Sequence, residues 1–382
     1  MKKIALLGST GSIGKQVLEV VDRYPEKFKI VSLCCNKSAK ELASQIQKYK
    51  PSVAGLTNAE YASEIANLPK GVTLYTGENA LLHCVLSEAD IIVVAVVGFC
   101  GLAPVIEACK MGKTIALANK ESLVVGGKIV TELAKKQGAT IIPVDSEHSA
   151  IWQCLHFNKS APFKKIILTA SGGALRNIPV DELERVTPEI ALNHPTWKMG
   201  AKITIDCATM MNKGLEVMEA CWLFDCTPND IEVVIHPQSI VHSMVEYADN
   251  ALIAQLSNPS MDIPIQLALS YPERIEGSTK ALDFSLLSLD FCKPSLERYP
   301  CLALALESAK KGKNFPCALS GANEVAVELF LNGKIKFTQI SKYVRFALDN
   351  TAELEPTYEN LVKTDFLARE AVLNAYKEKK ID

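Results

Sequence analysis

Short apolar runs alternate with helical segments over residues 1–145 of the chain. The runs are rich in β-branched residues and are typical of strands in a parallel sheet, because helices cover both faces of such a sheet. The pattern therefore predicts an α/β fold that begins with a doubly wound, Rossmann-like parallel sheet. The predicted strands are residues 4–7, 29–34, 52–56, 91–97, 114–117 and 140–144.

The alternation breaks down after residue 145. Strand-like stretches at residues 166–169, 231–235 and 239–247 mix with helices and Pro-bearing loops, which predicts a central α+β domain over residues 146–276. Gly, Ser and Pro residues indicate a linker over residues 277–300. Residues 301–382 have helical periodicity and few strand signals, so we expect a C-terminal α-helical domain.

Composition narrows the class of protein. The 41 Lys and Arg residues nearly balance the 43 Asp and Glu residues, which argues against a nucleic-acid-binding surface. The longest apolar run, residues 91–100, is about half of a membrane-spanning length, so we expect no membrane partner. The cysteines include no Cys-x-x-Cys pair, and no apolar leader follows Met1. Both features lead us to expect a reduced, cytoplasmic protein.

A glycine-rich turn follows the first predicted strand. Its sequence is Gly8-Ser9-Thr10-Gly11-Ser12-Ile13-Gly14, and it opens a helix whose N-terminal N–H groups can bind a pyrophosphate. The second strand is followed by Asn36 and Lys37 and lacks the acidic residue that binds the ribose of NAD, whereas Lys37 can pair with a 2′-phosphate. The sequence therefore favours NADP, and a plain tight turn with a solvated lysine is the alternative.

Two carboxylates follow the predicted strand at residues 140–144. Asp145-Ser146-Glu147 lies at the carboxyl end of the sheet, where such folds bind ligands, and its oxygen donors suit Mg²⁺ or Mn²⁺. The same residues can instead cap the helix that follows.

A second carboxylate-bearing segment lies on a predicted helix. Its apolar stripe consists of Met211, Leu215, Met218 and Trp222, and Asn212 and Glu216 line an adjacent stripe beside Lys213. An amide, an ammonium and a carboxylate thus lie close together. A surface ion pair between Lys213 and Glu216 is the alternative.

Two loops carry candidate anion-binding residues. Thr169-Ala170-Ser171-Gly172-Gly173-Ala174 ends a strand in small residues whose N–H groups can form an anion nest. The loop at residues 193–200 contains His194 and Trp197, which suit a lid over a phosphorylated substrate. A plain turn and loop side chains packed into the core are the alternatives.

These segments together resemble the 1-deoxy-D-xylulose 5-phosphate reductoisomerase family. The resemblance covers almost the whole chain in the family's order. It implies that the protein isomerises 1-deoxy-D-xylulose 5-phosphate by retro-aldol and aldol steps and reduces the product with NADPH to 2-C-methyl-D-erythritol 4-phosphate. It also implies a homodimer that pairs through residues 231–255. The matching segments are residues 8–14, 116–123, 143–148, 169–174, 194–200, 208–216, 236–243 and 322–326.

The resemblance also implies a role for individual residues. The metal ligands are Asp145, Glu147 and Glu216, and Lys120 lies near the metal and the reacting oxygens. The substrate-binding residues are Ser146, Glu147, Ser171, His194, Trp197, Cys207, Asn212, Lys213 and Glu216. The NADPH-binding residues are Thr10, Gly11, Ser12, Ile13, Asn36, Lys37, Asn119, Lys120, Glu121, Gly200 and Met261.

One position departs from the family's pattern. Cys207 stands where the family usually has a serine that binds the phosphate, and a thiol is a weaker hydrogen-bond donor. In the C-terminal region, Asn323 and Glu324 are candidates to support the site.

Two other functions compete with the reductoisomerase: another NADP-dependent dehydrogenase of a phosphorylated carbonyl compound, and a non-catalytic NADPH sensor. The first needs a nucleophilic cysteine with a histidine partner, and the second does not need the carboxylates.

Overall fold

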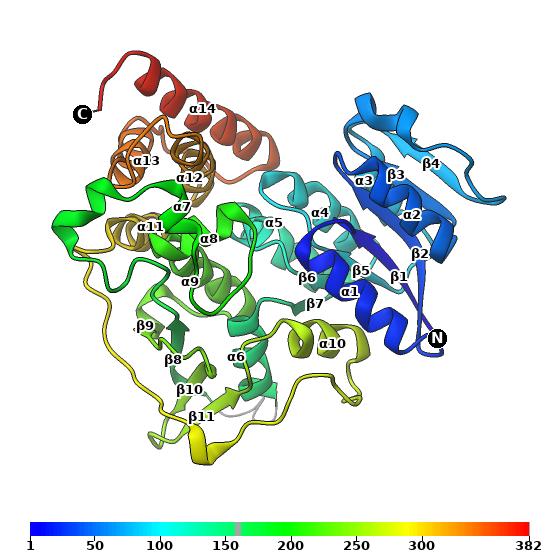
Figure 1. The fold of residues 1–382 in the computed structure, drawn as a ribbon, viewed down its shortest axis with the longest axis horizontal. Helices are drawn as coiled ribbons and strands as arrows, with labels where there is room; N and C mark the ends of the chain where they lie inside the picture. The colour runs from blue at the N-terminus through cyan, green and yellow to red at the C-terminus, as the bar shows by residue number, and fades with distance from the viewer. Residues whose placement is uncertain (157–161, 382) are drawn as a thin grey trace. The chain divides into compact units, whose positions relative to one another are not determined.

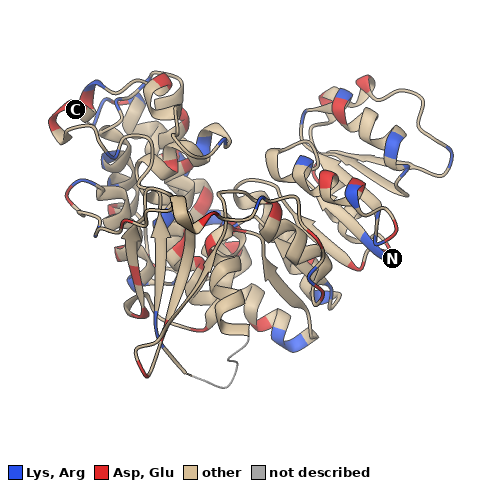
Figure 2. Ribbon diagram, turned by 60° about the horizontal axis from the view of Figure 1, so that its bottom comes forward, with Lys and Arg blue, Asp and Glu red and all other residues tan. Residues whose placement is uncertain are grey.

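The computed structural model describes residues 1–156 and 162–381, so the last residue of the predicted helical domain lies outside it (Figure 1). The described chain forms two compact units. The first unit contains residues 1–122, 130–149 and 260–279, and the second contains residues 123–129, 150–259 and the chain from 280 onwards. Basic and acidic positions are interspersed along the ribbon (Figure 2).

The first unit is built on a parallel sheet with the strand order β4-β3-β2-β1-β5-β6-β7 among the described residues. Every neighbouring pair in it is parallel, and the strand order reverses between β1 and β5, which marks the ligand-binding edge of a doubly wound sheet. The strands are β1 (Lys2–Leu7), β2 (Phe28–Cys35), β3 (Val53–Leu56), β4 (Thr73–Thr76), β5 (Ile91–Val94), β6 (Thr114–Leu117) and β7 (Thr140–Pro143). The helices between them are α1 (Ser12–Arg23), α2 (Ala39–Tyr49), α3 (Ala80–Val85), α4 (Leu102–Lys110) and α5 (Glu121–Gln137).

A late segment of the chain completes the first unit. Helix α10 (Asp262–Ser270) buries Ile265, Ala268 and Leu269 in the same apolar cluster as α1, α2 and the sheet. The Nζ atom of Lys2 donates hydrogen bonds to the carbonyls of Leu269, Ser270 and Tyr271 at 3.0, 3.1 and 2.6 Å, which satisfies the open C-terminal end of α10. The predicted boundaries differ here, because residues 260–276 were expected in the central domain.

The second unit contains a mixed sheet and a group of helices. Its described strands have the order β11-β10-β8-β9, with β8 and β9 parallel and the other pairs antiparallel. They are β8 (Phe163–Ala170), β9 (Ile231–Ile235), β10 (Val241–Tyr247) and β11 (Leu252–Leu256). The helices include α6 (Ser146–His156), which begins in the first unit, α7 (Pro188–Leu192), α8 (Ala201–Ala208), α9 (Met211–Phe224), α11 (Pro300–Lys311), α12 (Phe315–Leu331), α13 (Gln339–Asp349) and α14 (Tyr358–Lys377).

The C-terminal helices share their core with the central region. Residues of α8, α9 and α11 to α14 form one apolar cluster, so the predicted C-terminal helical domain belongs to the same compact unit as most of the central domain. The predicted linker at residues 277–300 is irregular, but it is fixed where Ile235 and Cys292 exchange backbone hydrogen bonds of 2.8 and 3.0 Å. The α/β fold class with its doubly wound sheet and helical C-terminal region is confirmed.

The predicted apolar stripe of α9 is wrong at one position. Met211, Leu215 and Met218 are buried, whereas Trp222 is 40% exposed. The reason is that α9 is buried on all sides from Met211 to Ala220, and Trp222 lies beyond that stretch near the end of the helix. No helix in the described part of the chain combines the length and the hydropathy needed to cross a bilayer.

Candidate functional site

The glycine turn after β1 has the close backbone packing of a phosphate-binding loop. Gly8 has a φ of +90°, and a Cβ atom on it would lie 2.4 Å from the carbonyl oxygen of Ala95. A Cβ atom on Gly14 would lie 2.2 Å from the carbonyl oxygen of Gly8. These two positions therefore require glycine. Gly11 is the N-cap of α1 and provides no side-chain cap, so the first N–H groups of the helix point to an anion site.

The carboxyl end of β2 carries the exposed residues Asn36 and Lys37. The amide oxygen of Asn36 accepts a hydrogen bond from the Thr57 hydroxyl at 3.0 Å, which fixes the side chain. Glu41, the first carboxylate after β2, forms an ion pair of 2.9 Å with Lys15. The position that holds the ribose of NAD therefore offers an amide and a lysine instead of a carboxylate, which suits a 2′-phosphate.

Asn119 joins the loops that follow β5 and β6. Its buried amide nitrogen lies 3.1 Å from the carbonyls of Val96 and Gly98 and 3.0 Å from Oε2 of Glu121. Its oxygen accepts the Ser122 N–H at 3.1 Å. The Asn119 side chain thus shapes the cofactor side of the first unit by holding these loops together.

Lys120 and Asp145 form a largely buried ion pair at the ends of β6 and β7. The Lys120 Nζ lies 2.7 Å from Oδ2 of Asp145, and the two side chains are 9% and 16% exposed. Asp145 also has the position of a helix cap, because it directly precedes α6 and its backbone oxygen accepts the Ser149 N–H at 2.8 Å. Its carboxylate, however, faces Lys120.

Asp145 and Glu147 offer a pair of hard oxygen donors. One carboxylate oxygen of each lies within 4.8 Å of the other, and the Ser146 hydroxyl donates to Glu147 at 2.6 Å. Two carboxylates at this separation, at the carboxyl edge of a parallel sheet, fit a divalent ion that prefers oxygen ligands.

The loops of the second unit place His194 beside Ser171. The Nδ1 atom of His194 accepts the backbone N–H groups of Thr196 and Trp197 at 3.2 and 3.0 Å, so the neutral ring carries its proton on Nε2. That atom donates to the Ser171 hydroxyl at 2.9 Å. Burial, and then the nearby charge of Arg176, lowers the pKa of His194. His194 is therefore a neutral hydrogen-bond donor.

Gly173 brings the Ser171 loop against the end of α8. Its N–H donates to the Ser171 hydroxyl at 3.2 Å, and its φ is +73°. A Cβ atom on it would lie 2.5 Å from the carbonyl oxygen of Cys207. Because the Ser171 oxygen accepts from both His194 and Gly173, the Ser171 hydroxyl proton is left to donate to a bound anion.

Asn212, Lys213 and Glu216 lie together on the first turns of α9. Glu216 is fully buried, and its two carboxylate oxygens accept hydrogen bonds from Asn212 and Lys213. Lys213 is 4% exposed, so this is not the surface ion pair that the sequence left open. A buried ammonium of this kind is a strong partner for a substrate phosphate.

Arg176 is a candidate that the sequence analysis missed. Its guanidinium donates to the backbone oxygen of Ser171 at 3.3 Å and contributes to the lowered pKa of His194. The residue spacing gave no signal for it, because Leu175 separates Arg176 from the run of small residues at 171–174.

Trp197 makes an edge contact with the ring of His242, with ring centroids 6.3 Å apart.

The predicted site residues are divided between the two units. The first unit holds the glycine turn, Asn36, Lys37, residues 119–121 and residues 145–147. It also holds Met261, which packs against the core of the nucleotide-binding sheet although it lies far along the chain. The second unit holds the remaining candidates, which are Ser171, His194, Trp197, Gly200, Cys207, Asn212, Lys213 and Glu216.

These features define a class of protein. A doubly wound sheet with a dinucleotide-type glycine turn is combined with a carboxylate pair for a divalent ion and a set of phosphate-type ligands. Such a protein is a dinucleotide-dependent oxidoreductase of α/β type.

Comparison with known proteins identifies the family. Family models match the chain in order: 1-deoxy-D-xylulose 5-phosphate reductoisomerase at residues 4–127, the C-terminal domain of that enzyme at residues 141–224, and the DXP reductoisomerase C-terminal domain at residues 256–371. The chain is 48% identical to the 1-deoxy-D-xylulose 5-phosphate reductoisomerase of Thermoanaerobacter pseudethanolicus, over 98% of this chain and 100% of that protein. The corresponding Clostridium perfringens protein is 47% identical with the same coverage. The chain therefore belongs to the 1-deoxy-D-xylulose 5-phosphate reductoisomerase family.

Solved structures support the same assignment. A crystal structure of DOX-P reductoisomerase in complex with NADPH, fosmidomycin and magnesium has a TM-score of 0.94 at 38% identity, covering 100% of this chain and 99% of that one. The Zymomonas mobilis 1-deoxy-D-xylulose 5-phosphate reductoisomerase in complex with NADPH has a TM-score of 0.90 at 38% identity, covering 98% of this chain and 99% of that one.

Proposed function

We propose that this protein converts 1-deoxy-D-xylulose 5-phosphate into 2-C-methyl-D-erythritol 4-phosphate, using NADPH and a divalent Mg²⁺ or Mn²⁺ ion. The substrate is isomerised by retro-aldol and aldol steps to a branched aldehyde, which NADPH reduces, as in the non-mevalonate route to isoprenoids. The observation that carries this proposal is the pairing of Lys120 with Asp145 at 2.7 Å, beside Glu147, in a chain of this family.

NADPH binding is assigned to the first unit and Gly200. The turn residues Thr10 to Ile13 bind the pyrophosphate with the N-terminal N–H groups of α1. Asn36 and Lys37 bind the 2′-phosphate, since the first carboxylate after β2, Glu41, is paired with Lys15. Asn119 and Glu121 hold the loop beside the cofactor, and Met261 shields the nicotinamide from the core side of the same unit.

The metal ligands are Asp145, Glu147 and Glu216. Their oxygen donors fit Mg²⁺ or Mn²⁺, and such an ion supplies Lewis-acid stabilisation of the charge that develops on the substrate oxygens. Lys120 orients Asp145 through their ion pair, and its ammonium is held where it can stabilise an alkoxide or transfer a proton. Ser146 orients Glu147 and binds a substrate hydroxyl.

The substrate phosphate is assigned to the second unit. Ser171 donates its free hydroxyl proton, and His194 donates from Nε2 as a neutral ring. Lys213 and Asn212 provide an ammonium and an amide on the first turns of α9, with a weaker contribution from the Cys207 thiol. Trp197 covers the carbon chain of the substrate as the loop at residues 193–200 closes.

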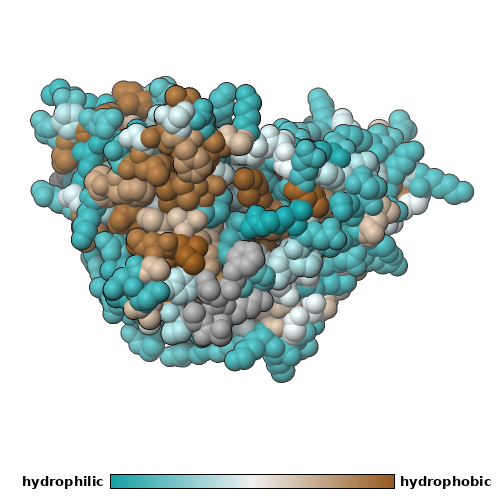
Figure 3. Space-filling model, turned by 90° about the horizontal axis from the view of Figure 1, so that it is seen from below, coloured by the Kyte–Doolittle hydropathy of each residue, from teal (hydrophilic) through white to brown (hydrophobic). Residues whose placement is uncertain are grey.

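We further propose a homodimer in the cytoplasm. Large apolar side chains gather on one face of the second unit (Figure 3). Exposed apolar residues of this unit include Leu252 and Ile253 on the edge strand β11 and Phe284 and Leu286 in the segment after residue 280. An apolar surface beside an unpaired strand edge suits pairing with a second copy. All cysteines of the described chain are free thiols, which suits a reducing compartment.

The test follows NADPH oxidation after 1-deoxy-D-xylulose 5-phosphate is added with Mn²⁺ or Mg²⁺, then with a chelator, and with NADH in parallel. We expect oxidation that requires the metal and is much slower with NADH.

Asp145→Asn and Glu216→Gln should each lower kcat by at least about a thousandfold, because each removes charge from the metal site, whereas the surface variant Glu107→Gln should retain activity. A folded protein that binds NADPH but oxidises none would favour the sensor or another carbonyl substrate.

A further inference from the structure

Helix α8 connects two parts of the proposed phosphate site. The loop at residues 193–200 ends at its first turn, and Cys207 lies in its last turn. Thr204 holds the end of the loop twice, because its N–H and its hydroxyl donate to the carbonyl of Gly200 at 3.1 and 2.8 Å. Space is open around Gly200, where a Cβ atom would meet nothing within 4 Å. The position of α8 therefore determines where the loop ends.

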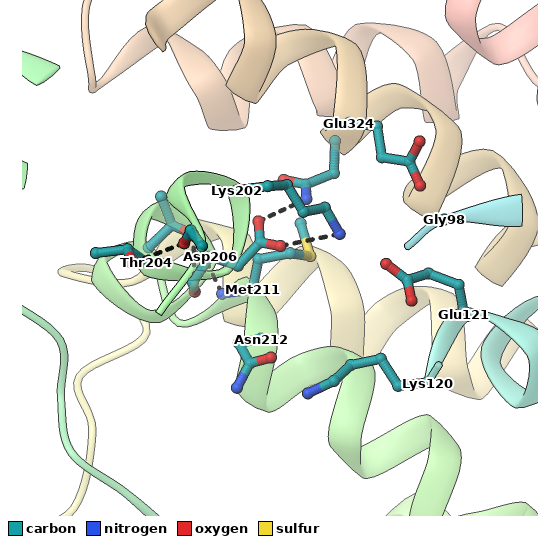
Figure 4. A network of polar contacts seen from close by, with 12 residues as sticks. Gly98, Lys120, Glu121, Lys202, Thr204, Asp206, Met211, Asn212 and Glu324 are labelled. Carbon is teal, nitrogen blue, oxygen red and sulfur yellow. Dashed lines mark hydrogen bonds and ion pairs between the residues drawn. The ribbon is translucent and has the colours of Figure 1, made fainter. Parts of the chain in front are cut away.

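A buried carboxylate lies in the last turn of α8. Asp206 is 1% exposed, and its Oδ2 atom forms an ion pair of 3.0 Å with Lys202 one turn earlier (Figure 4). A carboxylate at this depth is costly unless charged or amide partners surround it. The backbone oxygen of Asp206 also accepts the Thr209 hydroxyl at 3.2 Å, and Thr209 accepts the Met211 N–H at 3.3 Å. Asp206 is thus linked to the first residue of α9.

The remaining oxygen of Asp206 is held by the C-terminal helices. The amide nitrogen of Asn323 donates to Oδ1 of Asp206 at 2.7 Å. Asn323 is fully buried in the middle of α12, and its neighbours Ala322 and Ala326 belong to the apolar core. Apolar contacts alone allow a helix to slide or rotate on its neighbour, whereas an amide–carboxylate bond fixes one register.

We propose that Asn323, Asp206 and Lys202 form a positioning network that fixes α8 on α12 and so sets the geometry of the loop at residues 193–200 and of Cys207. This inference rests on the proposed function, because it assigns the C-terminal helices the task of shaping the phosphate site. None of these side chains takes part in the chemistry; they act through His194, Trp197 and Cys207.

The main test uses Asn323→Ala in the full-length protein. The variant leaves an oxygen of Asp206 without its donor, so amide hydrogen exchange over residues 193–208 should become about tenfold faster. The KM for the phosphorylated substrate should rise about tenfold, with kcat changed by less than about twofold.

The matched control is Asn314→Ala on the same helix. Asn314 is as deeply buried, but its side chain bonds to Ala352, Leu354 and Thr364 and has no part in the α8 contact. The Asn314→Ala variant should lower the stability of the protein. It should leave amide hydrogen exchange at residues 193–208 and the KM for the phosphorylated substrate unchanged. Equal effects of the two variants on the loop would overturn the proposal, since the amide would then contribute only general stability.

A charge exchange gives a second, independent check. Asn323→Asp places a carboxylate against Asp206 and should disturb the loop more than Asn323→Ala does. Adding Asp206→Asn restores an amide–carboxylate pair and should bring the exchange rate and the KM back toward the wild-type values. Absence of this recovery contradicts the network. If the wild-type protein oxidises no NADPH, the proposed function fails, and the exchange measurement still decides whether the network positions α8.

Discussion

At the scale of single residues, the proposed phosphate site contains one unusual candidate donor. Cys207 is partly buried at the end of α8, and the backbone of Gly173 packs directly over its carbonyl. The space around residue 207 is therefore fixed by backbone contacts that do not depend on its side chain. The family usually has serine here, and a hydroxyl is a stronger donor than a thiol.

We expect Cys207→Ser to improve substrate binding. The KM for 1-deoxy-D-xylulose 5-phosphate should fall by about threefold with kcat nearly unchanged, because a stronger hydrogen bond to the phosphate stabilises the ground state and the transition state equally. Steady-state kinetics measures both constants. Cys292→Ser, which removes an exposed thiol, should change neither. An increase in KM for Cys207→Ser would show that the rest of the site has adapted to the thiol.

The candidate residues with a family motif were predictable, but their hydrogen-bonding states were not. Asp145, Glu147 and Lys213 were candidates from their chemistry, with a helix cap and a surface ion pair as alternatives, and the family resemblance assigned their roles. The tautomer of the neutral His194 ring depends on two backbone N–H groups that reach Nδ1 only once the loop at residues 193–200 is folded. The contribution of Arg176 likewise depends on a contact with the backbone of Ser171, for which residue spacing gives no signal.

At the scale of elements, a charged contact joins two of the C-terminal helices. Glu307 on α11 accepts two hydrogen bonds from Arg345 on α13, at 3.0 and 2.5 Å, and one ion pair of 3.0 Å comes from Lys311. These partners, Arg345 first, lower the pKa of the Glu307 carboxyl from 4.5 to about 2. The contact therefore stabilises the fold at any pH at which the unfolded carboxyl is ionised.

We expect Glu307→Gln to weaken the protein at neutral pH and not in acid. The side chain is 36% exposed, so solvent screening limits the loss to about 0.5–1 kcal/mol in the free energy of unfolding at pH 7. Because the folded pKa lies below the unfolded one, the difference from wild type should shrink as pH falls from about 4.5 towards 2. Urea denaturation at several pH values measures it. The exposed Glu26→Gln serves as control, and a difference independent of pH would contradict the assignment.

Elements with strong apolar patterns were predicted, including the edge strands β7 and β9, whereas the edge strands β4 and β11 were not. The predicted strand at residues 114–117 matches β6, and that at residues 231–235 matches β9. Strands β4 and β11 contain no fully buried residue, so their apolar signal is weak. The placement of α10 in the first unit depends on contacts with α1 and Lys2, which lie more than two hundred residues away in sequence.

At the scale of the whole molecule, the exposed apolar side chains of the second unit are the clearest sign of assembly. Soluble monomers rarely expose large continuous apolar surfaces, whereas the interfaces of obligate dimers are about as apolar as a protein core. The edge strand β11 adds unpaired backbone groups to this face.

We expect Leu252→Asp to convert the proposed homodimer into monomers, because it places a charge within the apolar face. Sedimentation velocity at micromolar concentration measures the change. Leu86→Asp is the matched control, since Leu86 lies in the first unit and both leucines are 54% exposed. The control should sediment as wild type does. Dimers of unchanged affinity in Leu252→Asp would place the interface elsewhere.

The return of α10 to the first unit has a consequence for biosynthesis. A ribosome delivers residues 1–149 early, yet Ile265, Ala268 and Leu269 complete the same apolar cluster, and the carbonyls that bind Lys2 belong to residues 269–271. Most nascent chains fold their first domain first. Here the nucleotide-binding unit keeps an uncovered apolar face until residue 279 has emerged, and by then residues 150–259 of the second unit have already been made. We therefore expect this face to be the part of the nascent chain that recruits chaperones while residues 150–279 are synthesised.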